Sequence, residues 1–227
     1  MAANSFAFSP WTPGPQEAIV TASTVTMLLV RRTLFIDGSN LYGGLFDLLQ
    51  PGEYIDFAAL LAFMERDLPV EEVKFYGTYM RIDPSKSEAH RLRVRAQKAF
   101  FDTARNHPKV SFFKGHFSGA GKEKGVDVRL AVDMAVGAAT HQYDEAVLMT
   151  GDADLKYAVE RAQAFGKRVS LAALGSRFPF GIAPIAALCV VYDLGGFFRE
   201  HVRPVYKGRA SHLLIRDLNP AVPIEQI

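Results

Sequence analysis

The chain has 227 residues, of which 49% are hydrophobic and 22% charged, and its formal net charge is +2. This is the composition of an ordinary soluble globular protein with one sizeable core plus extensions. A net charge this small does not by itself indicate a nucleic-acid partner, so any such partner has to be argued from where the charges lie. The single cysteine, Cys189, excludes an internal disulfide and a Cys-rich zinc site and favours a reducing compartment, so cytoplasmic localisation is expected.

The first 32 residues show no helical or strand periodicity. Three prolines stand among small and polar residues near the start, which predicts a poorly ordered extension over residues 1–32. No basic segment precedes an apolar one, which argues against a signal peptide. The apolar run 25–30 is far shorter than the ~20 residues of a membrane helix, so no membrane partner is expected. Segments with strand or helix periodicity begin just after Met27. A further hypothesis is therefore that translation in the cell starts at Met27.

Apolar runs alternate with amphipathic ones from residue 33 to about residue 202. Strands are predicted over 33–37, 73–80, 110–117, 145–150, 168–174 and 187–192. Helices are predicted over 41–49, 56–66, 85–106, 126–137, 155–165 and 194–202, with Asp56 and either Ser85 or Ser87 as N-caps. Strands that are nearly continuously apolar and alternate with helices predict an α/β domain over 33–202 with a parallel sheet buried on both faces.

Two segments break this pattern. Residues 119–125, GAGKEKG, hold glycines and charges without an apolar face, so they are predicted to form a mobile loop. The C-terminal tail, 203–227, has three prolines and no clear period, so little regular structure is expected there.

Carboxylates stand at the ends of two predicted strands. Asp37 ends the first strand, and Asp152 and Asp154 follow the fourth. In open α/β sheets the carboxyl ends of the strands line the crevice where ligands bind. Asp127 opens the helix that leads into the fourth strand, and its helical spacing from Leu130 predicts that its side chain points toward the sheet and away from water.

Four clustered carboxylates would repel one another, by about 1 kcal/mol per pair ~4 Å apart in water and roughly 4 kcal/mol at an effective dielectric of 20. Such a cluster is expected to take up protons or to bind a cation. Oxygen ligands without a nearby His or Cys cluster predict Mg²⁺ or Mn²⁺. For each residue alone an alternative stays open: Asp127 as a favourable charge at a helix start, Asp152 or Asp154 as an N-cap, and Asp37 as a turn residue.

Three segments together resemble the NYN family, a branch of the PIN-like ribonucleases. They are FIDGSNLY (Phe35–Tyr42), KGVDVRLAVDM (Lys124–Met134) and VLMTGDADL (Val147–Leu155), the last followed by the strand RVSLAAL. The resemblance covers about residues 33–199. It implies a three-layer α/β/α fold with a mainly parallel sheet, and a metal-dependent ribonuclease that leaves 5′-phosphate and 3′-hydroxyl products, with endonucleolytic cleavage as the expectation.

The resemblance also implies roles for individual residues. The catalytic and metal-binding positions match Asp37, Asp127 and Asp152, and Asp154 matches the second acidic position of its motif. Among the substrate-binding candidates, Asn40 matches an asparagine that orients the site, Thr150 a small hydroxyl residue before the Gly-Asp, and Lys124 the family lysine. Ser39 and Asp133 receive supporting roles behind these residues, Asp133 because it lies roughly 120° from Asp127 around the helix.

An RNA substrate requires basic residues around the carboxylates. Lys114, Lys122, Lys124 and Arg129 flank the glycine-rich segment beside Asp127, and they are the expected phosphate contacts. A second basic group lies on the 85–106 helix and its lead-in and consists of Arg81, Lys86, His90, Arg91, Arg93, Arg95 and Lys98. An ordinary solvated helix face explains the second group equally well. Phe178 and Phe180 are candidates for stacking on bases or, alternatively, for filling the core.

Other classes of site fail at single positions. A P-loop would need a glycine where His116 stands and a Ser or Thr at Glu123, and a Rossmann motif would need a glycine at Lys124. An aspartyl phosphatase of the haloacid dehalogenase type would need an aspartate at Ser39. One competing hypothesis stays open, a catalytically weak member that uses the fold as an RNA-binding or protein-interaction module. A homodimer is also an open alternative, because no residue pattern defines an interface.

Overall fold

The computed structural model describes residues 30–49, 53–119, 121–193, 213–217 and 222–223. Internal contacts divide the chain into two units, Met1–Val30 and Arg31–Ile227, and all the elements named below belong to the second unit. The division into an extension over 1–32, a domain over 33–202 and a tail over 203–227 stays a prediction. The helix expected over 194–202 lies outside the described residues.

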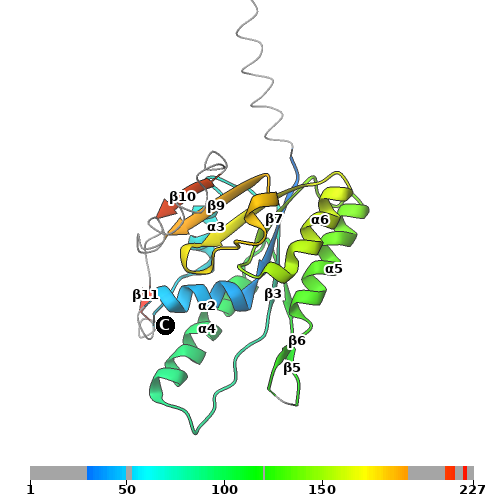
Figure 1. The fold of residues 1–227 in the computed structure, drawn as a ribbon. Helices are drawn as coiled ribbons and strands as arrows, with labels where there is room; N and C mark the ends of the chain where they lie inside the picture. Colours follow the sequence, from blue (N-terminus) through cyan, green and yellow to red (C-terminus); the bar gives the residue numbers. More distant parts are fainter. Residues whose placement is uncertain (1–29, 50–52, 120, 194–212, 218–221, 224–227) are drawn as a thin grey trace, which may run out of the picture. The chain divides into compact units, whose positions relative to one another are not determined.

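Strands and helices alternate along the second unit (Figure 1). The main sheet contains β1 (Arg32–Asp37), β3 (Glu72–Gly77), β4 (Val110–Lys114), β7 (Glu145–Met149), β8 (Arg168–Leu174), β9 (Leu188–Asp193) and β10 (Leu213–Asp217). The helices are α2 (Gly38–Leu48), α3 (Phe57–Met64), α4 (Glu88–Arg105), α5 (Val126–Ala139) and α6 (Lys156–Ala164). Short 3-10 turns are η1 (Ala153–Leu155), η2 (Gly175–Arg177) and η3 (Ala183–Ile185), and short ladders pair β5 (His116–Phe117) with β6 (Glu123–Lys124) and β2 (Glu53–Tyr54) with β11 (Val222–Pro223).

The strand order of the main sheet is β10-β9-β8-β7-β1-β3-β4, and all six pairings between neighbours are parallel. The chain therefore builds β3 and β4 on one side of β1 and then returns to place β7 on the other side. This reversal of strand order lies between β1 and β7, and ligands of open α/β sheets bind at such a point, outside the carboxyl ends of the strands. The predicted α/β architecture is confirmed.

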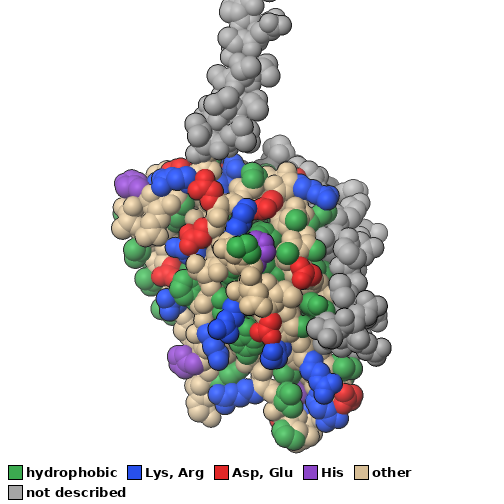
Figure 2. Space-filling model, turned by 180° about the vertical axis from the view of Figure 1, so that it is seen from behind, with side chains coloured by type: hydrophobic (Ala, Val, Ile, Leu, Met, Phe, Trp, Pro, Cys, Tyr) green, Lys and Arg blue, Asp and Glu red, His purple; other side chains and the backbone are tan. Residues whose placement is uncertain are grey.

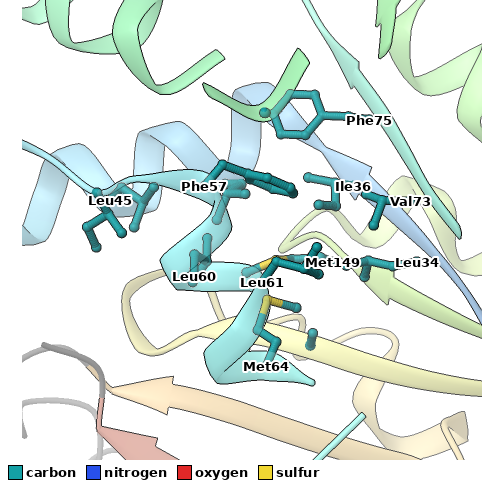
Figure 3. Close-up of a cluster of buried hydrophobic side chains, with 14 of the residues drawn as sticks. Leu34, Ile36, Leu45, Phe57, Leu60, Leu61, Met64, Val73, Phe75 and Met149 are labelled. Atoms are coloured by element: carbon teal, nitrogen blue, oxygen red, sulfur yellow. The ribbon is translucent and has the colours of Figure 1, made fainter. Parts of the chain in front are cut away.

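Helices cover both faces of the sheet. Because side chains alternate along each strand, neighbouring residues of one strand pack against opposite helical layers. Leu34 and Ile36 of β1 pack into a core with α2, α3 and α4 (Figure 3). Phe35, between them, packs into a second core with α5 and α6. Figure 1 shows these two helical layers on opposite sides of the strands. Apolar residues are therefore needed on both faces of a strand, which is why the strand segments are largely apolar.

Helix starts follow the capping residues in the sequence. Asp56 caps α3 by accepting hydrogen bonds from the backbone N–H groups of Ala58 and Ala59, as predicted. Of the two candidate caps for α4, Ser87 is the one that accepts, from the N–H of His90. None of the described helices combines the length and the apolar character needed to cross a bilayer.

Three expectations about local structure are wrong. The third predicted strand, 110–117, is broken at Gly115, where an added Cβ would lie 2.2 Å from Thr78 Oγ1, so this position requires glycine. Part of the predicted mobile loop then forms β6, which pairs antiparallel with β5 as a hairpin. The C-terminal tail, expected to lack regular elements, supplies β10 and β11.

Candidate functional site

Asp37 ends β1 at the sheet's carboxyl edge and is only 4% exposed. Its Oδ1 accepts a hydrogen bond from the backbone N–H of Asn40 at 3.0 Å, and its Oδ2 accepts one from the Thr150 hydroxyl at 3.0 Å. Thr150 Oγ1 in turn accepts from the backbone N–H of Asp152, also at 3.0 Å. A chain of hydrogen bonds thus ties the end of β1 to the segment after β7.

Asn40 forms a second tie between the same two segments. Its Oδ1 accepts from the N–H of Gly151 at 2.8 Å, so the first turn of α2 holds the loop that carries Asp152. Ser39, beside Asn40, is half-buried in the same turn. The DGSN and TGD motifs are therefore in direct contact, although 113 positions separate Asp37 from Thr150 in the sequence.

Two of the four aspartates act as helix caps. Asp37 is the N-cap of α2, and Asp152 is the N-cap of η1, where its Oδ1 accepts from the N–H of Asp154 at 2.9 Å. The capping alternative is thus confirmed for Asp152, and Asp37 caps a helix rather than an isolated turn. A carboxylate has about four lone-pair sites, so one or two accepted hydrogen bonds leave sites for another ligand.

Asp127 lies in the first turn of α5, and its side chain is exposed rather than turned into the core as predicted. Leu130 and Met134, which share its helical face, are buried. In the first turn Val126 is buried, whereas Asp127 is exposed. Helical spacing identifies the face of the helix on which Asp127 lies, but it does not determine how far the burial of that face extends into the first turn.

The carboxylates are coupled through their charges. Burial raises the pKa of Asp37 to about 6, opposed by its hydrogen bonds from Asn40 and Thr150, and the nearby charges of Asp127 and Glu123 raise it further. Partial desolvation also raises the pKa of Asp127, and repulsion from Asp152, Glu123 and Asp154 adds to that shift. Side chains from β1, β6, α5 and the loop after β7 therefore share one region of negative potential.

Glu123 was not among the predicted site residues, and it belongs to this region. It lies on β6, and its Oε1 is buried with no hydrogen-bond partner within the described part of the chain. Its charge acts on both Asp37 and Asp127. A polar oxygen that is buried without a partner is costly. The only signal in the sequence was its position two residues before Gly125, inside a segment that was expected to be a mobile loop.

The donor set suits a hard divalent cation, because every candidate ligand is a carboxylate oxygen and the mutual repulsion would be relieved by positive charge. Within the described residues, however, no group of three or more His, Cys, Asp or Glu side chains is arranged closely enough to hold a metal ion. The residues fit the cation in chemistry and in charge. Their side chains do not form a closed coordination shell.

Basic residues line a cavity of about 210 Å³ beside the first turn of α5. Lys124 and Arg129 are part of its wall, together with Lys114 and His116 of the adjoining strands. Lys122 does not line it and lies at the turn of the β5–β6 hairpin, where its N–H donates to Ser118 Oγ. Three of the four expected phosphate contacts, Lys114, Lys124 and Arg129, are thus brought to one cavity.

Asp133 supports α5 rather than the carboxylate region. Its Oδ2 accepts from the Tyr76 hydroxyl at 3.0 Å and lies 3.6 Å from Arg129 Nε. Arg129 also covers the ring of Phe113, 4.3 Å from its centroid, so its guanidinium is held beside the cavity. Of the two phenylalanines proposed as stacking or core residues, Phe178 packs in the core and Phe180 is 53% exposed.

Comparison with known proteins agrees with this architecture. A crystal structure of a protein of unknown function from Vibrio parahaemolyticus superposes with a TM-score of 0.54 at 18% identity, over 71% of this chain and 92% of that one. At this identity the likeness shows the fold alone. No curated protein matches the chain. The model of the NYN domain matches residues 31–183, more than half of the chain, and includes every predicted site residue. This chain therefore belongs to the NYN domain family.

Proposed function

We propose that this protein is a metal-dependent ribonuclease that cleaves RNA phosphodiester bonds at the carboxyl edge of β1 and β7. NYN domains are generally nucleases, and PIN-like nucleases usually use divalent metal ions. The observation that carries the proposal is that hydrogen bonds through Thr150 and Asn40 bring Asp37 and the Asp152 loop together where the strand order reverses. The charge of Asp127 acts on Asp37, and the charges of Asp152 and Asp154 act on Asp127. These four aspartates would hold Mg²⁺ or Mn²⁺, which supplies an activated water and stabilises charge on the phosphodiester oxygens.

The chain's own residues have three tasks in this proposal. Thr150 and Asn40 fix the Asp37 carboxylate and the Asp152 loop relative to each other through the hydrogen bonds described above. Lys124 and Arg129 bind phosphate oxygens and offset the repulsion between the carboxylates and the RNA backbone. Endonucleolytic cleavage, cytoplasmic localisation and a homodimer stay predictions.

Asp152→Asn is the direct test. Asparagine is an N-cap as good as aspartate, so the fold should be kept while one negative ligand is lost. Mutation of a residue that only hydrogen-bonds to a metal ligand typically lowers metal affinity or activity by about 10–100-fold. Loss of a ligand itself should therefore lower the cleavage rate by at least about 100-fold. The assay incubates single-stranded and structured RNA with Mg²⁺ or Mn²⁺, and EDTA should abolish cleavage by the wild type.

Asp144→Asn is the matched control, because Asp144 lies just before the amino-terminal end of β7, away from the carboxyl ends of the strands, and pairs with Arg31. It should cleave as the wild type does. Undiminished cleavage by Asp152→Asn would overturn the assignment. RNA binding without cleavage by both the wild type and Asp152→Asn would instead favour the competing hypothesis, an RNA-binding module of the same fold.

Glu123→Gln tests the residue that the sequence did not reveal. If Glu123 contributes its charge to a divalent ion, the glutamine variant should need roughly tenfold more Mn²⁺ for half-maximal cleavage. Glu160→Gln, on the exposed surface of α6, is the control and should leave the Mn²⁺ dependence unchanged. An unaltered Mn²⁺ titration for Glu123→Gln would remove Glu123 from the site without affecting the four aspartates.

A further inference from the structure

We propose that an unpaired RNA strand approaches the carboxylates along a groove that crosses the carboxyl ends of β3 and β4 and follows the β5–β6 hairpin. The groove begins at the cavity beside α5 and ends at the hairpin. That the strand is RNA rests on the proposed function, whereas the groove itself follows from cavities, charges and rings of the described residues.

Three cavities adjoin one another through shared lining residues, and we take them together as the groove. The cavity of about 210 Å³ beside α5 and a second of about 350 Å³ are both lined by Lys114, Gly115 and His116. The second cavity shares Arg81 and Phe117 with a third of about 300 Å³. Cavities of this size lie near the lower end of the range that encloses small ligands, so the groove offers several adjoining subsites rather than one closed pocket.

The charge of the groove is one-sided although the net charge of the protein is close to zero. Arg81, Lys114, His116, Lys124 and Arg129 line it, and no Asp or Glu is among its described lining residues. Figure 2 shows Lys and Arg side chains gathered over the lower part of one face, the end at which the hairpin lies in Figure 1. A groove lined by basic residues complements the negatively charged phosphate backbone of a nucleic acid.

Aromatic rings lie between these charges. Phe117 is half-buried on β5, with the Arg81 guanidinium 5.6 Å from its ring centroid. Tyr79 lies in the second cavity, with Lys114 Nζ 5.8 Å from its ring centroid. Aromatic rings within a basic groove bind unpaired bases by stacking, and a duplex cannot use them because its bases are already stacked on one another. This combination favours a single strand.

The floor of the groove also carries a hydroxyl without a partner. Thr78 is 4% exposed and lines the second cavity, and its Oγ1 has no hydrogen-bond partner within the described part of the chain. Buried polar atoms in folded proteins are nearly always satisfied, by protein, water or ligand. A hydroxyl or base edge of a bound nucleotide would satisfy it, and this observation is independent of the charges and the rings.

Binding of a labelled unpaired oligoribonucleotide, followed by fluorescence anisotropy in EDTA so that hydrolysis does not contribute, tests the groove. Phe117→Ala should weaken binding at least about fivefold, and Phe117→Trp should restore it, because stacking depends on the ring. Lys114→Ala should lower the slope of log affinity against log salt by about 0.7, the value for one phosphate contact on a single strand. A duplex of equal length should compete poorly.

The controls are Phe165→Ala and Lys156→Ala, exposed residues of the same types at the end and start of α6, and both should bind as the wild type does. Unchanged binding by Phe117→Ala and Lys114→Ala, or equal competition by the duplex, overturns the groove. Either result can occur while Asp152→Asn still abolishes cleavage, and in that case the groove is wrong and the proposed function is unaffected. Groove-dependent binding without any cleavage in Mg²⁺ or Mn²⁺ supports the groove and overturns the nuclease.

Discussion

Asp37→Asn is expected to abolish metal-dependent cleavage and, at the same time, to make the metal-free protein more stable at neutral pH. The ordinary pKa of the carboxyl is 3.8, and burial together with nearby negative charge raises it to about 6 in the folded protein. Between these two values the unfolded chain loses the proton while the folded protein keeps it. Stability therefore falls as the pH rises from about 4 through about 6, by on the order of 2–3 kcal/mol in total.

The asparagine carries no charge, so the variant should lack this loss. Its side-chain oxygen can still accept from the Asn40 N–H, which keeps the cap of α2. Urea unfolding in EDTA at pH 4.5 and 7.5 would measure the effect, and the wild type should lose stability between the two pH values more steeply than the variant. Mg²⁺ or Mn²⁺ should stabilise the wild type, more so above pH 6 where Asp37 is ionised, and should not stabilise the variant.

Asp56→Asn provides the matched control, because Asp56 is also the aspartate N-cap of a helix and lies outside the carboxylate region. Its substitution should change stability by less than about 0.5 kcal/mol at either pH. If Asp37→Asn were less stable than the wild type at pH 7.5 in EDTA, the raised pKa of Asp37, attributed first to burial and then to nearby negative charge, would be wrong.

Gly38→Ala is expected to destabilise the protein by several kcal/mol, although alanine is the better helix former. An added Cβ at this first position of α2 would lie 2.3 Å from a Phe75 ring carbon and 2.7 Å from the backbone oxygen of Tyr76. Both atoms belong to β3, the neighbour of β1 in the sheet, and the backbone oxygen cannot move aside as a flexible side chain can. Overpacking of this kind typically costs about 1–3 kcal/mol and sometimes more.

Gly43→Ala, in the same helix, separates packing from helix propensity. Its nearest neighbour would be the end of the Arg177 side chain at 3.5 Å, an ordinary contact. This substitution should be neutral or stabilising, by up to about 1 kcal/mol. Chemical unfolding of the two variants measures the difference, and equal stabilities would show that close approach to β3 is not the reason for glycine after Asp37.

Local periodicity was sufficient to predict most of the fold. Strands buried on both faces require long apolar runs, and such runs can be recognised in segments such as β1 and β7 without knowledge of their neighbours. The caps Asp56 and Ser87 were predictable because a cap acts within three residues of itself. At Gly115 the local pattern failed to predict the end of β4, because the close approach of Gly115 to Thr78, which follows β3, joins segments distant in the sequence.

The sequence by itself determined the α/β class and the candidate carboxylates at the strand ends, because strand and helix periods and chain-adjacent motifs are local properties. Only the tertiary structure decided that β7 and β3 flank β1, that Asp127 is exposed, and that Glu123 joins the acidic region from a hairpin. Strand order, the burial of the first turn of α5 and the path of the hairpin depend on packing between distant segments. Residue spacing along the chain carries no direct record of such packing.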